Sequence, residues 1–465
     1  MKKLDELYPG IGNDILIRNI QYTVSNVGRG DLFLCLATKN IDIYAQVVEA
    51  VKRGAVAAIV QNDIGEVGIP LIKIDNVRRE LPYLCERFYN NPCDKIKMIG
   101  ITGTEGKSSV GLIIQSLLGS NECGYFGNDF RKCHMFREEV SLYNSKNFYS
   151  SIDEFVKFDC NYAVVEADSL SLINSVLEAV VFDVAVYTNV SSEHIDIHGS
   201  FDNYIHAKMR LFQKVKKDGI RVLNKDDIYF ESFSKVCRDG FVSYGRDNDC
   251  TLQIVDYKCL YNKTTIQFKY KGNEFNLFSP LLGEANVSNL AAALLVCLEM
   301  GVSLDYLLSR VDKIVIDEHM LFLKTNDIYK VMIDYSHTPN SILKLISFVK
   351  SLNYSRIIVV AGQEGNRGMD RRSLFGEVIV KNASYAIFTN DNPGREDPNN
   401  IINDITKNIK NYANYEVILD RGTAIKKAID MADDNDIVLI LGRGNDSDLA
   451  YSAIADRHIR EANNI

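Results

Sequence analysis

The sequence predicts an α/β protein with three domains. Short apolar runs of strand type recur along the 465 residues and alternate with helical segments, as in parallel sheets covered by helices. The chain is too long for one ordinary domain, and its pattern divides it into residues 1–95, 96–312 and 313–465. Hydrophobic residues make up 46% and charged residues 25% of the chain, as is typical of a globular protein.

The net charge and the spacing of the cysteines indicate which kinds of binding partner to expect. The net charge of −8 gives no basic footprint for nucleic acid and disfavours an anionic membrane surface. No apolar run approaches the ~20 residues that span a bilayer. The ten cysteines are scattered, without a Cys-x-x-Cys pair, which fits reduced thiols. We expect a cytoplasmic monomer that acts on small molecules, with no nucleic-acid or membrane partner.

The first domain, residues 1–95, is predicted to be a small α/β unit. Apolar runs at Leu32–Leu36, Ala57–Val60 and Leu71–Ile74 are separated by a helical stretch around Tyr44–Arg53. The Asn90-Asn91-Pro92 segment is typical of a linker.

The second domain, residues 96–312, is predicted to hold a parallel sheet. Its strands of buried type are Ile96–Ile101, Tyr162–Glu166 and Val184–Asn189. Later, Thr265–Tyr270 and Glu274–Phe278 alternate polar and apolar residues around a Lys-Gly-Asn turn, which predicts a β-hairpin. Residues Asn286–Met300 form a strongly apolar helix.

The third domain, residues 313–465, is predicted to be a second, Rossmann-like open sheet. Its strands are Val331–Asp334, Arg356–Ala361, Tyr385–Asn390 and Ile437–Gly442. Ligands of such sheets bind at the carboxyl ends of the strands. Each motif described below falls at such an end.

A phosphate-binding loop is predicted between the strand that opens the second domain and the next helix. Its candidate ATP-binding residues are Gly103, Thr104, Glu105, Gly106, Lys107, Ser108 and Ser109. The glycines allow backbone N–H groups to approach phosphate oxygens, and the helix N-terminus adds a positive dipole. Lys107 can reach the outer phosphates, and the Ser108 hydroxyl can ligate Mg²⁺. Because Ile101 replaces the first glycine of the strict Walker pattern, an ordinary glycine turn with an exposed lysine is the alternative interpretation.

The form Thr-Gly-Thr-x-Gly-Lys-Ser at residues 102–108 resembles the ATP loop of the Mur ligases. These include the enzymes that add amino acids to peptidoglycan precursors and folylpolyglutamate synthetase. Further matching segments follow in order: Thr188–Ser200, Tyr204-x-x-x-Lys208, Asn224-x-Asp226-Asp227, Asn286-x-x-Asn289, Asp334–Pro339, Gly362–Arg367, Asp391–Pro398 and Gly442–Asp446. The ordered series is similar above all to the MurE branch, which adds the third residue of the peptidoglycan peptide.

The resemblance implies an ATP-dependent acid–amino-acid ligase that forms an amide bond. The donor carboxylate, on a UDP-N-acetylmuramoyl-dipeptide, is phosphorylated by ATP, and the amine of an amino acid displaces the phosphate. Residues 1–95 would bind the uridine nucleotide-type donor, 96–312 would bind ATP, and 313–465 would bind the acceptor. Because two anions must meet, metal ions and lysines must neutralise their charge.

The resemblance also assigns catalytic roles to Lys107, Glu166, His194 and Lys208. Glu166 and Ser108 would contact Mg²⁺, and His194 would be a ligand of a second metal. Lys208 would be carbamylated, so that the resulting anion positions a metal, which requires a lysine that loses its proton in a desolvated site. From the residues alone, a surface glutamate, a structural histidine and a solvated helix lysine are the alternatives.

Four further positions match nucleotide contacts of the family. They are Asn286, Asn289, Asp334 and His337. Amide groups can contact a base edge and a carboxylate can hold ribose hydroxyls. Asn289 is equally compatible with a helix-face asparagine, whereas the strand-end position of Asp334 favours function.

The resemblance places an acceptor site in the third domain. Arg367 follows a strand and a glycine turn, so its guanidinium could grip an α-carboxylate through two hydrogen bonds. The remaining acceptor residues would be Asp391, Asn392, Gly442 and Asp446. The Asp-Asn-Pro-Gly run at 391–394 is also favourable turn chemistry.

The resemblance breaks at positions that face the donor and the acceptor. In family members that add meso-diaminopimelate an arginine follows Asp-Asn-Pro, whereas here Gly394 stands there and Arg395 comes one place later. Tyr22–Val24 replaces an Asp-Ser-Arg of the donor domain. The amino acid and the donor therefore stay open. One alternative is a Mur-like ligase with another carboxylate donor outside the main peptidoglycan pathway. Another is a non-catalytic ATP-binding paralogue, against which the retained metal-site residues argue.

Overall fold

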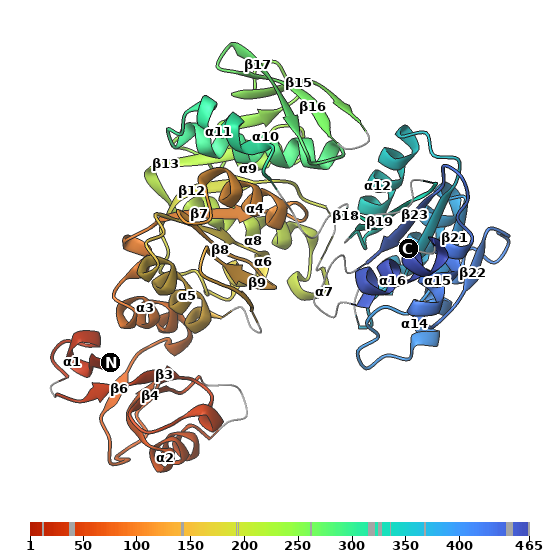
Figure 1. The fold of residues 1–465 in the computed structure, drawn as a ribbon. Helices are drawn as coiled ribbons and strands as arrows, with labels where there is room; N and C mark the ends of the chain where they lie inside the picture. The colour runs from red at the N-terminus through yellow and green to blue at the C-terminus, as the bar shows by residue number, and fades with distance from the viewer. Residues whose placement is uncertain are drawn as a thin grey trace. The chain divides into compact units, whose positions relative to one another are not determined.

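The structure, a computed structural model, is shown in Figure 1. It describes residues 1–11, 14–36, 42–140, 144–191, 193, 195–260, 263–314, 321–323, 328–334, 336–366, 369–442 and 450–463. The chain divides into two compact units. The first comprises Met1–Tyr257, Ile266–Phe278 and Ala285–Ile314, and the second comprises Lys258–Thr265, Ser279–Glu284 and Val315–Ile465.

A small sheet opens the first unit. Its strands, in the order in which they pair, are β3 (Asn19–Gln21), β4 (Asp31–Leu34), β5 (Ala55–Val60) and β6 (Leu71–Lys73), and they are parallel. The other elements of this part of the chain are β1 (Lys2–Lys3), α1 (Leu4–Leu7), β2 (Leu16–Ile17), η1 (Val24–Asn26), α2 (Ile43–Arg53), α3 (Val77–Phe88) and η2 (Pro92–Asp94). Strands β1 and β2 pair with each other. The predicted small α/β unit is confirmed.

The side-chain alternation of β5 explains why this sheet is covered on two faces. Ala57 and Ile59 pack into the core that contains α3, whereas Ala58 and Val60 pack against α2. Helix α2 starts at Asp42, whose carboxylate accepts a hydrogen bond from the Ala45 amide, and ends at a glycine with left-handed backbone.

The central sheet holds eleven strands within the described residues. In pairing order they are β10 (Arg137–Glu139), β9 (Phe130–Lys132), β8 (Cys123–Phe126), β11 (Tyr162–Glu166), β7 (Lys97–Thr102), β12 (Phe182–Tyr187), β13 (Val215–Asn224), β14 (Val242–Gly245), β15 (Leu252–Cys259), β16 (Thr264–Tyr270) and β17 (Asn273–Ser279). Seven consecutive strands of this order run parallel, namely β8, β11, β7, β12, β13, β14 and β15. Their carboxyl ends therefore lie along one edge of the sheet.

Eight helices accompany this sheet in the described part of the chain. They are α4 (Lys107–Leu118), α5 (Ser145–Lys157), α6 (Ser169–Ile173), α7 (Ile195–His198), α8 (Phe201–Gln213), α9 (Phe230–Ser234), α10 (Glu284–Glu299) and α11 (Leu304–Val311). The predicted hairpin is confirmed as β16 and β17, joined by Lys271 and Gly272, both with positive φ. The predicted strand Val184–Asn189 is wrong at its end, because β12 stops at Tyr187 and the next two residues leave the sheet.

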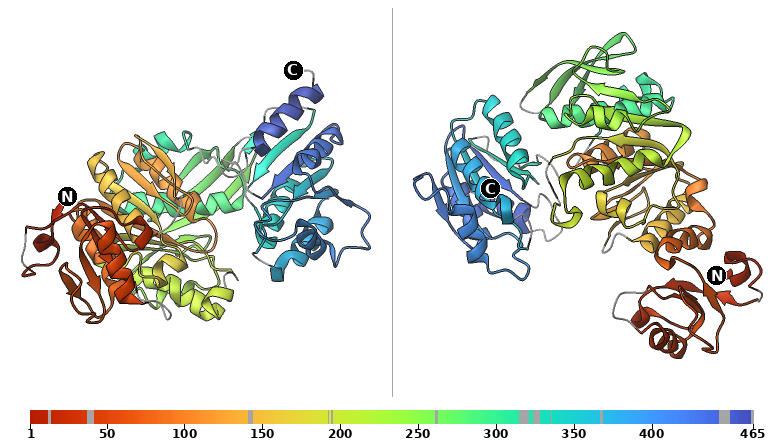
Figure 2. Two further views of the ribbon diagram at one scale, coloured as in Figure 1. Left: turned by 90° about the horizontal axis from the view of Figure 1, so that it is seen from below. Right: turned by 180° about the vertical axis from the view of Figure 1, so that it is seen from behind.

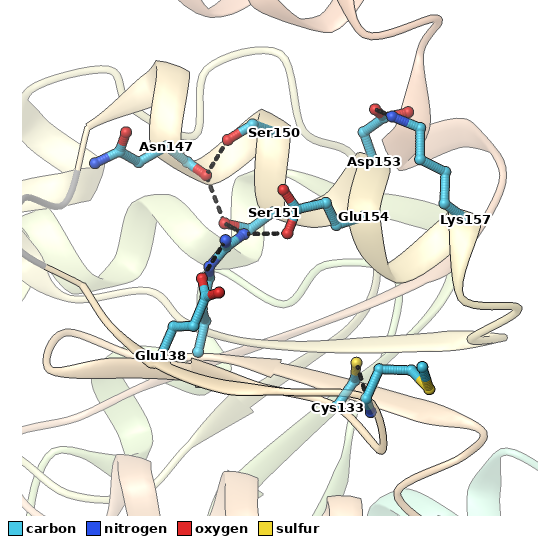
Figure 3. Close-up of polar contacts among 10 residues, drawn as sticks. Cys133, Glu138, Asn147, Ser150, Ser151, Asp153, Glu154 and Lys157 are labelled. Atoms are coloured by element: carbon cyan, nitrogen blue, oxygen red, sulfur yellow. Dashed lines mark hydrogen bonds and ion pairs between the residues drawn. The ribbon is translucent and has the colours of Figure 1, made fainter.

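An ion-pair network fastens the β9–β10 edge to α5. The Arg131 guanidinium lies 2.6 Å from a Glu138 carboxylate oxygen and 2.8 Å from one of Glu154, and it donates to the Ser151 hydroxyl at 2.9 Å. Figure 3 shows Glu138 and Glu154 converging between strand and helix, with the Ser150 and Ser151 hydroxyls on the Asn147 carbonyl. The network gives this exposed edge a fixed position beside β8.

The second unit is built on another largely parallel sheet. Its strands, in pairing order, are β18 (Leu321–Leu323), β19 (Lys330–Asp334), β23 (Ile437–Leu441), β20 (Ile357–Ala361), β21 (Tyr385–Phe388) and β22 (Tyr415–Val417). Only β18 among these is antiparallel to its neighbour. The four predicted strands are confirmed, except that β21 ends at Phe388, two residues before the predicted end at Asn390. Strands β18 and β22 were not predicted.

Helices cover both faces of this sheet, as the views in Figure 2 show in blue. The elements are α12 (Pro339–Ser351), η3 (Met369–Arg371), α13 (Arg372–Asn382), α14 (Pro398–Thr406), α15 (Arg421–Asp430) and α16 (Ala450–Asn463). Helices α12, α13 and α14 share one core with the sheet, and α15 and α16 share the other. The fold class is confirmed, and the domain bounds at 95/96 and 312/313 stay predictions.

No helix in the described ranges is both long enough and apolar enough to cross a lipid bilayer.

The carboxyl group of Glu86 on α3 makes a testable contribution to stability. Its side chain is 9% exposed, and Oε1 accepts a hydrogen bond from the Cys93 amide at 3.1 Å. Burial raises its pKa to about 7. Because this pKa exceeds that of the unfolded chain, the stabilisation is complete below the unfolded value and is lost as pH rises through 7.

We therefore expect the free energy of unfolding to fall by roughly 1 kcal/mol between about pH 6 and about pH 8, and Glu86→Gln to remove this component. Denaturant unfolding at several pH values measures it. The exposed Glu66→Gln serves as control and should keep the wild-type pH dependence. An unchanged slope in Glu86→Gln would contradict the assignment.

Candidate functional site

The predicted phosphate loop joins β7 to α4. Its two glycines, Gly103 and Gly106, have φ of +154° and +82°. A Cβ on Gly103 would lie 1.9 Å from the Thr188 hydroxyl oxygen, so this position has no room for a side chain. Lys107 folds back over the loop, and its ammonium donates to the Thr104 carbonyl at 2.9 Å. The alternative of an exposed lysine is wrong, because Lys107 is half-buried.

The residues that follow β12 brace this loop. The Asn189 side chain accepts from the Glu105 amide and donates to the Glu105 carbonyl, both at 3.0 Å. The Thr188 hydroxyl donates to the same carbonyl at 2.6 Å, and the Thr104 amide donates to the Asn189 carbonyl at 2.8 Å. Asn224, at the end of β13, in turn donates to the Thr188 carbonyl at 2.6 Å. Sequence reasoning quoted these residues as motif members but missed their bracing role, whose signal was polar residues directly after a buried strand.

Glu166 lies beside the start of the loop. The register of β11 against β7 pairs it with Ile101, and its side chain is 3% exposed. The Ser108 and Tyr125 hydroxyls donate hydrogen bonds to its carboxylate. Burial raises the pKa of the Glu166 carboxyl, and the Lys107 ammonium and the two hydroxyls oppose that rise. The alternative of a surface glutamate is wrong.

Lys208 of α8 is also buried against the loop. Its side chain is 2% exposed, its Nζ donates to the Gly103 carbonyl at 2.6 Å, and Nζ lies 4.3 Å from the centroid of the Tyr204 ring. Burial and the nearby Lys107 ammonium lower the pKa of Lys208 well below its ordinary value. A solvated helix lysine is therefore excluded. The proton is weakly held, as a reactive lysine requires.

Asn289 approaches the loop from α10. A Cβ on Gly106 would lie 2.6 Å from the Asn289 amide oxygen. The Asn289 side chain donates to that of Asn286 at 3.3 Å. Asn289 thus faces the phosphate loop and is more than a plain helix-face residue, and Asn286 lies beside it. Ser109 is buried in the first turn of α4.

The oxygen ligands around the loop are of the kind that binds Mg²⁺ when the ion is also coordinated by a nucleotide phosphate. Among the described residues no three His, Cys, Asp or Glu side chains form a metal-binding group. Mg²⁺ commonly takes one or two carboxylates and completes its shell with water and substrate phosphates. The Glu166 carboxylate and Ser108 hydroxyl are hard oxygen donors of this kind. His194, the predicted second ligand, lies outside the described residues.

In the second unit Asp334 and Gly442 meet at adjacent strand ends. Asp334 closes β19 and is buried, and its carboxylate accepts from the Ser336 amide at 2.8 Å. The Gly442 amide, just after β23, donates to the Asp334 carbonyl at 3.1 Å. His337 precedes α12, and its carbonyl accepts from the Gln363 side chain at 2.8 Å. These residues lie where ligands of open sheets bind.

Asp391 lies at the same edge, after β21. Its carboxylate is 3.9 Å from the Arg421 guanidinium, and both side chains are buried. A Cβ on Gly442 would lie 2.8 Å from Asp391 Oδ2, so Gly442 with φ +133° leaves space for this carboxylate. Arg421 also donates to the Leu441 carbonyl at 2.6 Å. Sequence reasoning missed Arg421, although an arginine that opens a helix after a short strand was a usable signal.

Asn392 has the geometry of a turn residue. Its side-chain oxygen accepts from the Gly394 amide at 3.3 Å, and its carbonyl accepts from the Gly365 amide at 2.8 Å. The turn interpretation of this run is therefore confirmed. Arg367 and Asp446, the other predicted acceptor residues, lie outside the described residues.

A buried arginine fixes the loop after Asn392. Arg372 is 0% exposed, and its guanidinium donates to both carboxylate oxygens of Glu396 at 2.6 and 2.7 Å. Glu396 also accepts from the Asn366 amide at 2.8 Å. The hydrogen bonds from Arg372 lower the pKa of Glu396 to about 2. Arg372 was not predicted, because its partner lies far along the chain.

Comparison with known proteins gives consistent matches. A family model described as the Mur ligase middle domain matches residues 101–297, and one described as the Mur ligase glutamate ligase domain matches residues 320–444. The UDP-N-acetylmuramoyl-L-alanyl-D-glutamate–2,6-diaminopimelate ligase of Fusobacterium nucleatum subsp. nucleatum is 32% identical over 454 residues, covering 96% of this chain and 90% of the relative.

Solved structures match over nearly the whole chain as well. A UDP-N-acetylmuramoyl-L-alanyl-D-glutamate–2,6-diaminopimelate ligase structure gives a TM-score of 0.70 at 25% identity, covering 96% of this chain and 94% of that one. The MurF ligase of Thermotoga maritima in complex with ADP gives 0.69 at 17% identity, covering 97% of this chain and 100% of that one. This second likeness shows a shared fold.

The crowding at Gly103 leads to a prediction. Gly103→Ala would place a methyl group on the Thr188 hydroxyl and strain the backbone, so we expect a loss of roughly 2 kcal/mol or more of stability and of nucleotide binding. Gly199→Ala is the control, because its φ is +74° with nothing within 4 Å of the added Cβ. It should cost only the backbone strain, about 1 kcal/mol, and keep nucleotide affinity. Thermal melting and calorimetric titration of an ATP analogue measure both effects, and equal behaviour of the two variants would contradict the geometry.

Proposed function

Because this chain belongs to the Mur ligase family of ATP-dependent ligases and is of the MurE type, we propose that it adds an amino acid to the carboxylate of a UDP-N-acetylmuramoyl-dipeptide. The observation that carries the proposal is the convergence of Glu166, Ser108 and Lys107 at the phosphate loop. The name of the Fusobacterium relative gives the same donor and 2,6-diaminopimelate as the acceptor.

The first step is phosphorylation of the donor carboxylate. The loop amides and Lys107 bind the outer phosphates, and Ser108 and Glu166 would hold Mg²⁺. When bound, the metal supplies neutralising charge between the γ-phosphate and the incoming carboxylate. The bracing by Asn189 and Thr188 keeps the loop in place, so that its donors are oriented before the reaction.

Lys208 would contribute a second anion. Burial lowers the pKa of its amine and so favours the neutral form, which can attack carbon dioxide. The nitrogen then loses a proton and a carbamate remains. Such an anion beside the loop would position a metal together with His194. This role follows from the resemblance, and the buried environment of Lys208 supports it.

The second step is attack by the acceptor amine on the acyl-phosphate, which releases phosphate. We assign Arg367, Asp391, Asn392, Gly442 and Asp446 to the acceptor. Arg421 holds the Asp391 carboxylate beside Gly442. We assign Asn286, Asn289, Asp334 and His337 to nucleotide contacts.

The wider assignments follow from the same family. We propose that residues 1–95 bind the donor, 96–312 bind ATP and 313–465 bind the acceptor. The ten free cysteines favour a reducing cytoplasm. A monomer is the simplest assembly for this reaction.

A second candidate is a ligase for a different carboxylate donor. It is favoured by Tyr22–Val24, which stands where donor-binding residues are expected and runs into η1. Gly394 likewise leaves the acceptor open. The experiment below separates the two candidates.

Phosphate release should be measured with Mg·ATP, the muramoyl dipeptide and a panel of amino acids including meso-diaminopimelate and L-lysine. We expect release only when donor and one acceptor are both present, with loss of at least about 100-fold in Glu166→Gln and Lys107→Met. Glu231→Gln, at an exposed position on α9, is the control and should keep the wild-type release of phosphate. Release that ignores the muramoyl donor but responds to another acid would favour the second candidate. If no combination of donor and acceptor releases phosphate, the proposal that this chain catalyses ligation is wrong.

Lys208→Ala should lower activity by at least about 100-fold, because the proposed carbamate is lost. A short carboxylic acid such as formate should restore part of it by supplying an anion to the vacated space. Lys214→Ala on the same stretch is the control, because Lys214 pairs with Glu178 away from the loop. Full activity of Lys208→Ala would refute the carbamate role.

A further inference from the structure

A buried tyrosine contacts the predicted metal ligand. Tyr125 lies on β8, the neighbour of β11 in the sheet, and it is 1% exposed. Its hydroxyl donates a hydrogen bond to Oε1 of Glu166. The two strands run parallel, so the tyrosine reaches the strand-end carboxylate from the side opposite to β7.

Two glycines make room for this ring. A Cβ on Gly111 of α4 would lie 2.8 Å from Tyr125 Cε2. A Cβ on Gly127, just after β8, would lie 2.6 Å from the Tyr125 hydroxyl oxygen and 2.9 Å from Glu166 Oε1. Neither glycine has a positive φ, so space and not backbone conformation requires glycine at these positions. The helix and the strand-end loop are therefore both shaped around the tyrosine.

The hydroxyl is the part of Tyr125 that needs explanation. Phenylalanine would fill the same apolar space, and the ring already packs against Phe130 at 5.1 Å between centroids. A buried hydroxyl is costly without a hydrogen bond and usually has a partner. Here the partner is the carboxylate that the proposed reaction needs at the phosphate loop.

The hydrogen bond restricts the orientation of the carboxylate. The terminal torsion of a glutamate is broad when unrestrained. A donor fixed on Oε1 sets the plane of the carboxylate, and ligand orientation by neighbouring hydrogen bonds strengthens metal binding.

We propose that Tyr125 is a positioning residue that orients Glu166 toward the Mg²⁺ of the bound nucleotide, with Gly111 and Gly127 providing the space. This inference rests on the proposed function, since it assumes that Glu166 contacts the metal. In this proposal Tyr125 acts through Glu166 and not through a contact of its own with the nucleotide or the donor.

Tyr125→Phe tests the inference, because it removes the hydroxyl and keeps the ring. The first readout is Mn²⁺ affinity in the presence of a non-hydrolysable ATP analogue, followed by electron paramagnetic resonance. We expect it to fall about tenfold or more. The second readout is the Mg²⁺ concentration for half-maximal phosphate release, which should rise by a similar factor, with much of kcat recovered at saturating Mg²⁺.

Tyr149→Phe is the matched control, because Tyr149 is a fully buried tyrosine on α5 that interacts electrostatically with Cys93, Glu86 and Cys85. It should leave metal affinity unchanged. If Tyr125→Phe does not fold, Gly111→Ala gives a second route, since it displaces the ring while keeping the hydroxyl and should weaken metal binding in the same way.

A Tyr125→Phe variant that binds Mn²⁺ as tightly as the wild type overturns the inference, even if its melting temperature falls. Failure of the proposed function gives a different result, because the wild type itself would then show no metal-dependent binding of the ATP analogue.

Discussion

The register between β11 and β7 is the constraint on which the site depends. It places Glu166 opposite Ile101, so a carboxylate stands next to the first residues of the phosphate loop. A slip by one residue would turn every side chain of the strand to the other face of the sheet. Glu166 would then point into the core, away from Ser108. The buried apolar residues on both faces of β11, among them Val164 and Val165, make such a slip costly.

Burial gives the charged groups at the loop their chemical character. Glu166 and Lys208 are both removed from water, and each has a pKa shifted toward its neutral form. The electrostatic interactions between these groups are stronger than they would be in solvent, because the effective dielectric constant is lower inside the protein. The loop carbonyl of Gly103 and the ring of Tyr204 hold the amine of Lys208 in one place. A nucleotide bound at the loop with its metal would balance the charges of Glu166, Lys208 and their neighbours.

The second unit fixes its strand-end loops with buried arginines. Arg372 binds the Glu396 carboxylate through two hydrogen bonds, and Arg421 holds Asp391 next to the Gly442 turn. The planar guanidinium of arginine presents its N–H donors in a fixed fork, so little conformational entropy is lost when it binds a carboxylate. Loops that carry polar side chains for a substrate can therefore remain fixed without a hydrophobic core of their own. This arrangement suits a site that must orient a small amino acid.

The sequence by itself determined β7, β11 and β12 of the central sheet, β19, β20, β21 and β23 of the second sheet, the β16–β17 hairpin, the phosphate loop and the ordered family motifs. These depend on local periodicity, turn chemistry and spacing. It did not determine β8, β9, β10, β13, β14 and β15 of the central sheet, or β18 and β22 of the second sheet. Several of these, such as β9, β18 and β22, have too few residues to carry a periodic pattern. It placed Thr188 and Asn189 in a strand, although they brace the phosphate loop. Only the tertiary structure decided the burial of Lys208 and the hydroxyl contact of Tyr125 with Glu166. It also decided which carboxylates the two buried arginines bind, Glu396 for Arg372 and Asp391 for Arg421. Each joins residues far apart in the chain, and the solvation and partners of a charged group depend on neighbours that local sequence does not specify.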